Sequence, residues 1–451
     1  MESFIHHIEW CVKDVNESTN NLITQYGFEL IAERHLFANR SINDGNDKIS
    51  IQQKVVQSGS SVFLLTQNDS DDSFDEYKQS DTSYPILSCC SSERNHQRDT
   101  VFNVCLEVKN IDACIERIIK TQSNYERDNA VLIPPITIEC ENNSRLRYSV
   151  IQSICGNIIH TLIESKEYRQ HRNLPFLPGF HHVQNRNLIT EKFNRFNIGN
   201  KPLTSYIDHV TYVCCEGQSK SILRWYKDCF GMERFLIDSR ETVEDDGIEI
   251  GQEVGMRLTV GEWISSWMCR EEGVRFDSSQ CSNEKMNFKL VLAEPLPGHT
   301  FSHVQQFLDD HGGPGIQHIG LMADTDITSS VERMVQHGAK FRKPPPAYYK
   351  LTDKRREILQ AKECLSKFEK LGLLLDTEVD SIHGDNQITI NECKKILIQI
   401  FSKPLFDENT FFLEILERRG ARGFGAGNIT ALAKSIILQQ ENERLHTSNN
   451  A

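Results

Sequence analysis

The stretch GGPGIQHIGL, residues 312–321, joins a glycine-rich turn to a run of apolar residues that is typical of a buried strand. A histidine interrupts that run at position 318. A lone histidine in a strand is most often a core residue satisfied by a backbone hydrogen bond, whereas a metal-ligand role requires partners from elsewhere in the chain. The interpretation of this strand therefore depends on whether such partners exist.

The composition is that of a globular protein, because 38% of the 451 residues are hydrophobic and 25% are charged. The length suggests roughly two to four domains. The net charge of −13 argues against a nucleic-acid partner. No apolar run approaches the ~20 residues of a membrane-spanning helix. The first residues, MESFIHHIEW, resemble neither a signal peptide nor an Arg-rich leader. We therefore expect a cytoplasmic protein, with a mitochondrial location as the alternative.

The 14 cysteines do not form any CxxC pair, so a structural zinc ribbon is not indicated. Because no secretory signal is apparent, we expect reduced thiols, most of them small residues of the core.

Three segments of the first half of the chain reappear, in the same order, in the second half. They share a hydrophobic alternation, and this repetition predicts a duplicated βαβββ module of the α+β class. Each half would form a curved, barrel-like mixed sheet with helices on its outer face. The matching pairs are 4–15 with 206–217, 102–118 with 317–334, and 157–165 with 410–418.

Composition shifts place the boundaries between these parts. A polar segment at 376–388 predicts a second surface loop inside the later module, and the last ordered element is expected to be a helix over 429–440. The predicted organisation is a metal-free N-terminal module at 1–165 with a flexible insertion at 68–99, a proline-containing linker at 166–204, a catalytic module at 205–420, and a C-terminal helix and tail at 421–451.

The repeat supplies the partners that His318 needs. The matching inward positions of the second half carry His209 and Glu414. A carboxylate inside FFLEIL is not expected to be buried without a partner. Two imidazoles and one carboxylate on one face form the triad that suits non-haem Fe(II), and its open positions allow substrate and O2 to bind together. For the three residues together, a metal site is the favoured interpretation.

The first half retains less of this chemistry. Its matching positions carry His7, Asn103 and Thr161, so only one histidine is kept. His6 beside His7 suggests a metal, but no further ligand is apparent in this half. Packing against the sheet is the favoured interpretation, and the N-terminal module is predicted to bind no metal.

The amino-acid sequence of several segments resembles that of the 4-hydroxyphenylpyruvate dioxygenase family of the vicinal-oxygen-chelate superfamily. The resemblance covers nearly the whole chain and implies one Fe(II) per chain, O2 as co-substrate and an aromatic α-keto acid as substrate. It also implies that the C-terminal helix gates the site. The motifs are IDHVTY, GGPGIQHIGL, RKPPPAYY, ILIQIFSKPLF, FFLEILERRG, GFGAGN and the interdomain segment NLPFLPGF.

The same resemblance implies a substrate pocket. Gln399 matches a glutamine that lines this pocket, and Phe401 and Phe424 match aromatic residues that sandwich the substrate ring. Ser278 falls where the family has a pocket serine.

Four positions depart from the family pattern. Val291 and Ala293 stand where a Pro-x-Asn sequence is typical, His303 stands where a glutamine is common, and Ile429 replaces a phenylalanine. These departures resemble the divergent dioxygenase-like branch and the 4-hydroxymandelate synthases. They favour 4-hydroxymandelate as product, with homogentisate in tyrosine catabolism as the alternative.

Two other functions are compatible with the sequence. One is a different reaction on the same fold, such as extradiol ring cleavage, against which Gln399 and Phe401 argue. The other is a non-catalytic interaction protein, against which the complete triad argues. GFGAGN is interpreted as a helix cap because no Lys-Ser/Thr follows, as a phosphate loop requires. The oligomeric state is left open, with a homodimer among the alternatives.

Overall fold

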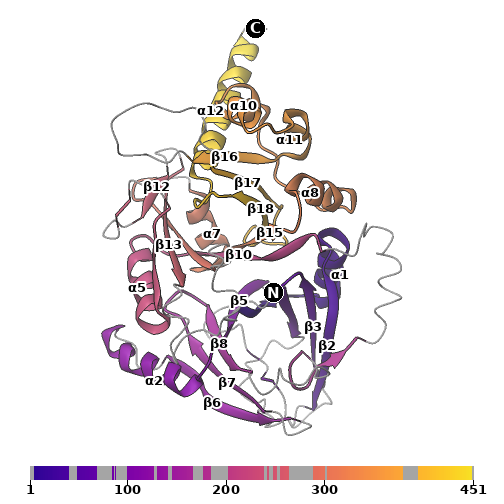
Figure 1. Cartoon of the computed structure of the whole chain (residues 1–451), viewed down its shortest axis with the longest axis vertical. Helices are drawn as coiled ribbons and strands as arrows, with labels where there is room; N and C mark the ends of the chain where they lie inside the picture. Colours follow the sequence, from indigo (N-terminus) through magenta and orange to yellow (C-terminus); the bar gives the residue numbers. More distant parts are fainter. Residues whose placement is uncertain are drawn as a thin grey trace.

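Two β-sheet modules stacked along the long axis of the molecule form the body of the protein (Figure 1). In this computed structural model the described residues are 5–39, 48–68, 84–85, 87, 99–125, 130–140, 145–165, 176–183, 202–237, 241–242, 247–250, 254–263, 288–299, 302–378 and 395–448.

The N-terminal module is a nine-stranded sheet in the order β6-β7-β8-β5-β1-β4-β3-β2-β9. Its helices are α1 (Val15–Tyr26), α2 (Ile111–Gln122) and the short 3-10 turn η2 (Ser123–Tyr125). Its strands are β1 (Ile5–Cys11), β2 (Glu29–Asn39), β3 (Lys48–Ser58), β4 (Ser61–Asn68), β5 (Thr100–Glu107), β6 (Val131–Glu139), β7 (Arg145–Gln152), β8 (Ile159–Glu164) and β9 (His181–His182).

The C-terminal module has the order β11-β13-β14-β10-β15-β18-β17-β16, and β12 pairs with β13. Its strands are β10 (Thr204–Val213), β11 (Met232–Phe235), β12 (Ile248–Ile250), β13 (Met256–Trp263), β14 (Lys289–Pro295), β15 (Gly315–Ala323), β16 (Leu374–Glu378), β17 (Lys395–Phe401) and β18 (Phe412–Arg419). Its helices are α5 (Ser219–Phe230), α7 (His303–His311), α8 (Ile327–Gln336), α9 (Pro346–Lys350), α10 (Lys354–Gln360), α11 (Leu365–Leu371) and α12 (Ala426–Ser448).

The two sheets have the same topology, which confirms the predicted repeat and the α+β class. Read from β16, the eight strands of the second order match the first eight strands of the first order, up to β11 in the place of β2. In this match β10 takes the place of β1, β15 that of β5 and β18 that of β8. The registers agree as well. Thr211 pairs with His318 between β10 and β15, as Glu9 pairs with Asn103 between β1 and β5.

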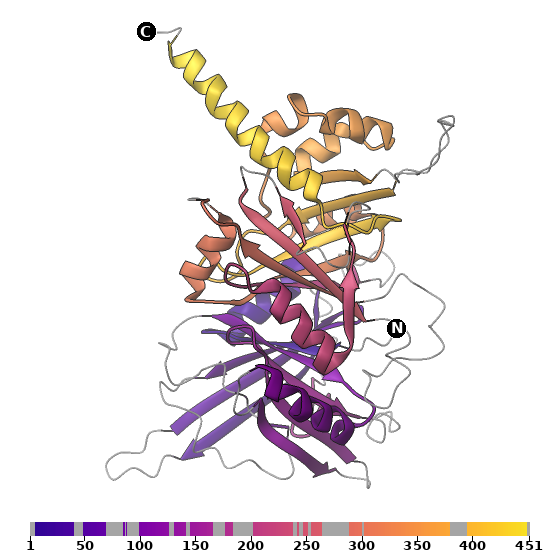
Figure 2. The same ribbon diagram turned by 90° about the vertical axis from the view of Figure 1, so that its left-hand side faces the viewer.

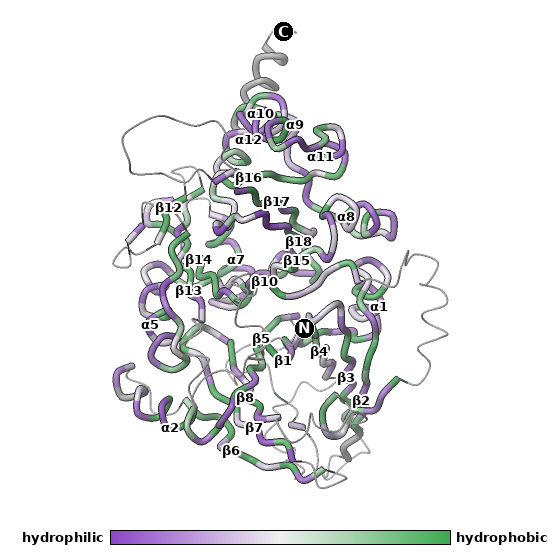
Figure 3. The backbone as a smooth tube through the Cα atoms, in the orientation of Figure 1, coloured by the Kyte–Doolittle hydropathy of each residue, from purple (hydrophilic) through white to green (hydrophobic). Residues whose placement is uncertain are grey.

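Side chains of the central strands point alternately into the core shared by the two modules and into the interior of their own module. Ile8 and Trp10 of β1 belong to a core that runs on into the second module, where Val210 and Tyr212 occupy the matching positions. The residues between them point into the interior of their own module, because successive side chains of a strand face opposite sides. Hydrophobic stretches run along the strands of both sheets (Figure 3). Helix α1 contacts α8, and α2 contacts α5, so helices of both modules help to cover this shared core.

The predicted linker and insertion contain structured parts. His182 of β9 pairs with Ala32 of β2, so this piece of the predicted linker extends the N-terminal sheet. Phe180 is buried in the interior of the same module, together with Tyr84 from the predicted insertion. Most of that insertion lies outside the described residues.

The C-terminal helix is longer than the predicted 429–440 and begins inside GFGAGN. Gly425, immediately before α12, has a φ angle of 75°. This backbone conformation is unfavourable for a residue with a side chain. The helix continues to Ser448, into the part of the chain that was predicted as a tail. Figure 2 shows α12 leaving the body of the molecule along most of its length. Among the helices of the described residues, none is long and apolar enough to cross a membrane.

Candidate metal centre

Three neighbouring strands of the C-terminal module carry the predicted triad, and the structure brings its side chains together. His209 Nε2 lies 3.1 Å from Glu414 Oε2, and His318 Nε2 lies 3.6 Å from the same oxygen. The two imidazole rings are perpendicular, with centroids 5.5 Å apart. His209 and Glu414 are buried, so three ligand atoms converge in a place that is largely closed to solvent.

A β-bulge in β10 aims His209 at the site. The register between β10 and β15 shifts between Ile207 and His209, so Asp208 and His209 both stand opposite Gly320. A bulge of this kind re-aims side chains at functional sites. Gly320 is required there, since a Cβ atom at that position would lie 2.2 Å from His209 Cε1.

A hydrogen-bond chain holds the far side of His209. Its Nδ1 lies 2.8 Å from Asp208 Oδ1, and Arg418 donates from Nε and Nη2 to the two oxygens of Asp208, each at 2.8 Å. Although burial acts in the opposite direction, Arg418 holds the pKa of the Asp208 carboxyl well below its usual range. The ionised carboxylate therefore fixes the proton on Nδ1 and leaves Nε2 of His209 to face the triad.

The two histidines differ in their electrostatics. Burial opposes protonation of His209, but Glu414 and Asp208 outweigh it, so its pKa lies above the usual value. Burial holds the pKa of His318 well below the usual value, and nearby His209 acts in the same direction. The nearby carboxylates thus favour the charged form of His209, whereas burial favours the neutral form of His318. Two imidazole nitrogens and a carboxylate oxygen that converge in this way are a donor set that fits a divalent cation.

A cavity of about 580 Å³ opens beside the triad. Its size lies within the ~300–1,000 Å³ of typical small-molecule sites. Phe424 lies with its ring perpendicular to His209, at 5.1 Å between centroids, and Phe401 lies 6.4 Å from His318. Six of the predicted pocket residues line this cavity, namely Val291, Ala293, His303, Phe401, Phe424 and Ile429.

The other two predicted pocket residues, Gln399 and Ser278, are not among the described residues that line the cavity. Gln399 is fully buried on β17 and is not among the residues that line the cavity. The loop at Gly425 lies against its amide, since a Cβ atom there would be 2.5 Å from Gln399 Nε2. Neither polar atom of this amide has a hydrogen-bond partner among the described residues. Ser278 lies outside the described residues.

Comparisons with known proteins agree with this geometry. Residues 208–355 match the model of the Glyoxalase/Bleomycin resistance protein/Dioxygenase superfamily. The chain is 30% identical over 393 residues to the 4-hydroxyphenylpyruvate dioxygenase-like protein of Rattus norvegicus, a match that covers 85% of this chain and 86% of that protein.

The chain belongs to the 4-hydroxyphenylpyruvate dioxygenase family. It is 26% identical over 440 residues to the 4-hydroxyphenylpyruvate dioxygenase of Neurospora crassa, covering 96% of this chain and 90% of that enzyme. A mutant of 4-hydroxymandelate synthase from Streptomyces coelicolor shares the fold, with a TM-score of 0.60 and 20% identity over 97% of this chain and 99% of that chain. The protein is therefore a vicinal-oxygen-chelate enzyme of the dioxygenase type, in the divergent dioxygenase-like branch.

Sequence reasoning missed several polar residues that line the dioxygenase cavity. Arg342 donates from Nη2 to Asn409 Oδ1 at 3.0 Å, and its guanidinium lies 5.2 Å from the ring centre of Phe412. The hydroxyls of Thr211 and Thr410 are buried and have no partner among the described residues. Arg342 stands inside the RKPPPAYY motif, so its charge beside a proline loop was the signal that could have identified it.

The polar segment predicted as a loop at 376–388 begins as a strand, because residues 376–378 belong to β16. These residues anchor the GFGAG loop. Asp376 Oδ2 accepts from Gly427 N at 3.0 Å, and Glu378 accepts from the backbone N–H groups of Arg422 and Gly423. The rest of the predicted loop lies outside the described residues.

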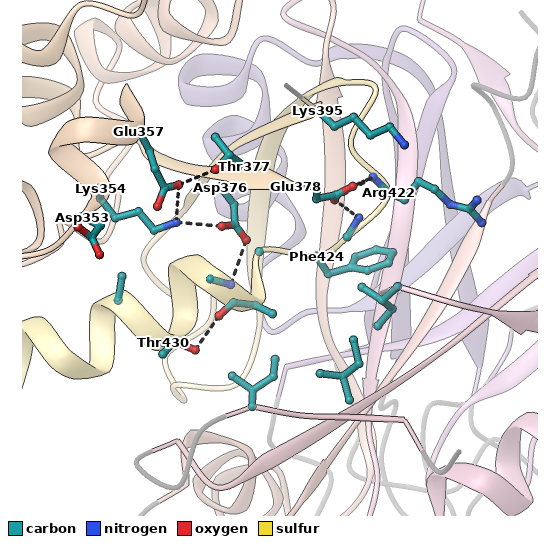
Figure 4. A pocket seen from close by; sticks show the side chains of 18 of the residues that line it. Asp353, Lys354, Glu357, Asp376, Thr377, Glu378, Lys395, Arg422, Phe424 and Thr430 are labelled. Atoms are coloured by element: carbon teal, nitrogen blue, oxygen red, sulfur yellow. Dashed lines mark hydrogen bonds and ion pairs between the residues drawn. The ribbon is translucent and has the colours of Figure 1, made fainter. Parts of the chain in front are cut away.

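Phe424 also lines a second, larger cavity of about 1220 Å³ (Figure 4). Some of its charged side chains pair with one another, as Figure 4 shows for Lys354 between Glu357 and Asp376, at 3.0 and 2.9 Å. The smaller cavity contains His209, His318 and Glu414, so it is the candidate active site of this dioxygenase.

Proposed function

We propose that the protein is an Fe(II)-dependent dioxygenase that oxidatively decarboxylates and hydroxylates 4-hydroxyphenylpyruvate. The observation that carries this proposal is the convergence of His209, His318 and Glu414 beside a largely apolar cavity in a member of this family. Iron bound by these three residues would supply the open coordination positions at which the keto acid and O2 meet.

The protein's own residues would prepare this site. Asp208 and Arg418 fix the ring of His209, so the ligand does not have to reorient when metal or substrate binds. Phe401 and Phe424 provide apolar walls beside the two histidines. Such walls would hold the substrate ring and exclude water from the reacting atoms.

The favoured product is 4-hydroxymandelate. Val291, Ala293 and Ile429 line the cavity with apolar groups where ring-hydroxylating relatives are expected to contact the phenol. Loss of a hydrogen-bond partner for a buried hydroxyl costs on the order of 1–3 kcal/mol. A difference of this size is enough to re-rank two substrate poses, one with the ring and one with the benzylic carbon nearest the oxidant. His303 also lines the cavity and is the residue most able to restore a phenol contact.

The test is an incubation of the full-length chain with Fe(II), 4-hydroxyphenylpyruvate and O2, followed by oxygen-uptake measurement and chromatography of the products. We expect oxygen uptake, release of CO2 and 4-hydroxymandelate as the main product, with none of these in a Glu414→Ala variant. Homogentisate as the main product would overturn the product assignment and leave the enzyme assignment intact. An iron-loaded chain without oxygen uptake would overturn the enzyme assignment for this substrate.

A further inference from the structure

A second β-bulge, in β1 of the N-terminal module, brings three metal-ligating side chains together. The register between β1 and β5 shifts between Ile5 and His7, so that Ile5 pairs with Leu106 and His7 pairs with Cys105. His6 and His7 therefore stand together opposite one residue, Cys105. Adjacent side chains of a regular strand point to opposite faces, and a bulge re-aims one of them.

The side chains at this bulge lie in close contact. His6 Nδ1 is 2.9 Å from His7 Nδ1, and one ligand atom of each of the three residues lies within 4.8 Å of the others. His7 and Cys105 are fully buried, while His6 is half-buried. The ring of Phe176 packs against both imidazoles, with centroid distances of 5.2 and 5.4 Å, and so covers the cluster.

From this geometry we propose that His6, His7 and Cys105 form a second metal site, and that its ligand is Zn²⁺. Two imidazole nitrogens and a thiolate are a soft donor set that zinc accepts in tetrahedral geometry. Zinc bonds of about 2.0–2.3 Å require ligand atoms roughly 3.3–3.6 Å apart. The three atoms thus need shifts of only about an ångström from their present positions. A water molecule would complete the coordination.

The site differs in chemistry from the triad at the corresponding place of the other module. There the bulge residues are Asp208 and His209, and the residue opposite them is Gly320. In the N-terminal module an imidazole stands in the place of the carboxylate and a thiol in the place of the glycine. The zinc would link β1 to β5 beneath the ring of Phe176.

Cobalt is the probe that tests this proposal, because Co²⁺ replaces Zn²⁺ and its bond to a thiolate gives an intense near-ultraviolet charge-transfer band. The triad contains no sulfur and cannot give this band. We expect the metal-free full-length chain to develop the band with one thiolate-bound cobalt per chain. It should persist in a His318→Ala variant, in which the triad is disrupted, and disappear when Zn²⁺ is added.

Three variants decide whether the band belongs to this cluster. Cys105→Ala should abolish it, whereas Cys114→Ala, which changes another buried cysteine on α2, should retain it. His6→Gln, at a half-buried position, should weaken cobalt binding at least tenfold. No band in the unchanged chain, or a band that survives Cys105→Ala, would overturn the proposal. If Cys105→Ala does not fold, unaltered cobalt affinity in His6→Gln would overturn it as well.

Discussion

The two modules share their topology and register but use their interiors differently. In the N-terminal module Glu9 accepts hydrogen bonds from Thr66 at 2.7 Å and from Asn103 at 3.1 Å, and Asn103 also donates to Thr161 at 2.9 Å. The buried polar groups therefore satisfy one another. In the C-terminal module the corresponding strands aim the triad into a cavity.

The two modules differ in this way because side chains fill the interior of one sheet and leave a cavity in the other. Tyr84, Leu177 and Phe180 come from segments between the strands and occupy the interior of the N-terminal module. The corresponding space of the C-terminal module is a cavity of about 580 Å³, bounded by the GFGAG loop and α12. The comparison teaches that a duplicated sheet can separate a filled, structural half from an open half while the strands stay the same.

The largest effect on metal binding is expected when one position of the C-terminal module is changed to the residue found in the N-terminal module. Gly320→Cys copies the residue at the matching position, Cys105, and its Cβ atom would collide with the His209 ring. Because His209 would be displaced, we expect iron affinity to fall at least about 100-fold. Metal titration followed by oxygen uptake measures this loss. An iron affinity within a few-fold of the original would contradict the importance of the glycine.

The next prediction concerns His160, which matches Leu413 in the other module. The ring is fully buried, with Nδ1 3.0 Å from Val104 O and Nε2 2.7 Å from Tyr226 Oη, and burial lowers its pKa to about 4. The unfolded chain, with a histidine pKa near 6.5, binds the proton first as the pH falls. Stability is therefore fully present above pH ~6.5 and decreases towards pH ~4, by about 3 kcal/mol in all.

A His160→Leu variant should lack this part of the pH dependence. Denaturant unfolding between pH 4 and 7.5 measures it, and His182→Leu serves as the control because that side chain is exposed. Equal slopes of stability against pH for the variant and the unchanged chain would show that His160 does not carry the effect.

A smaller effect on metal binding is expected when Arg418 is replaced. Among the described residues, no arginine is seen to support His7 as Arg418 supports His209 through Asp208. Arg418 holds Asp208, donates to Gly423 O at 2.6 Å, and lies 4.9 Å from the ring centre of Phe424. Arg418→Met keeps an unbranched, flexible stem and removes these bonds. Loss of a residue that orients a metal ligand typically lowers metal affinity about 10–100-fold. Calorimetric titration of the metal measures this, and Arg419→Met on the same strand is the control.

The sequence alone was sufficient for the repeat and the triad, because strand alternation and the order of the matching segments are both visible in it. It could not reveal the bulge that brings Cys105 opposite His6 and His7, since a bulge is a property of strand pairing. Nothing in the sequence therefore indicated that Cys105 lies close to His6 and His7, and the metal-free N-terminal module stays a prediction. It also could not show that Asp376 and Glu378 anchor the GFGAG loop, because their partners are backbone groups brought close only by the fold.

The smallest effect is expected at the sheet edge, where the modules differ again. The edge strand β6 of the N-terminal module is largely open to solvent, whereas its counterpart β16 lies under α10 and α12. Covering an edge strand removes its capacity to pair with other chains, and here it also fixes the wall of the cavity.

Asp376 is central to this cover, because it accepts from Gly427 N and pairs with Lys354. Asp376→Asn keeps an acceptor but removes the charge, so the first turn of α12 should open more easily by about 1 kcal/mol. Hydrogen exchange at 426–432 measures this opening. The control is Asp353→Asn, because Asp353 is exposed and, like Asp376, lines the larger cavity of Figure 4. Unchanged exchange in Asp376→Asn would show that the carboxylate does not fasten the helix.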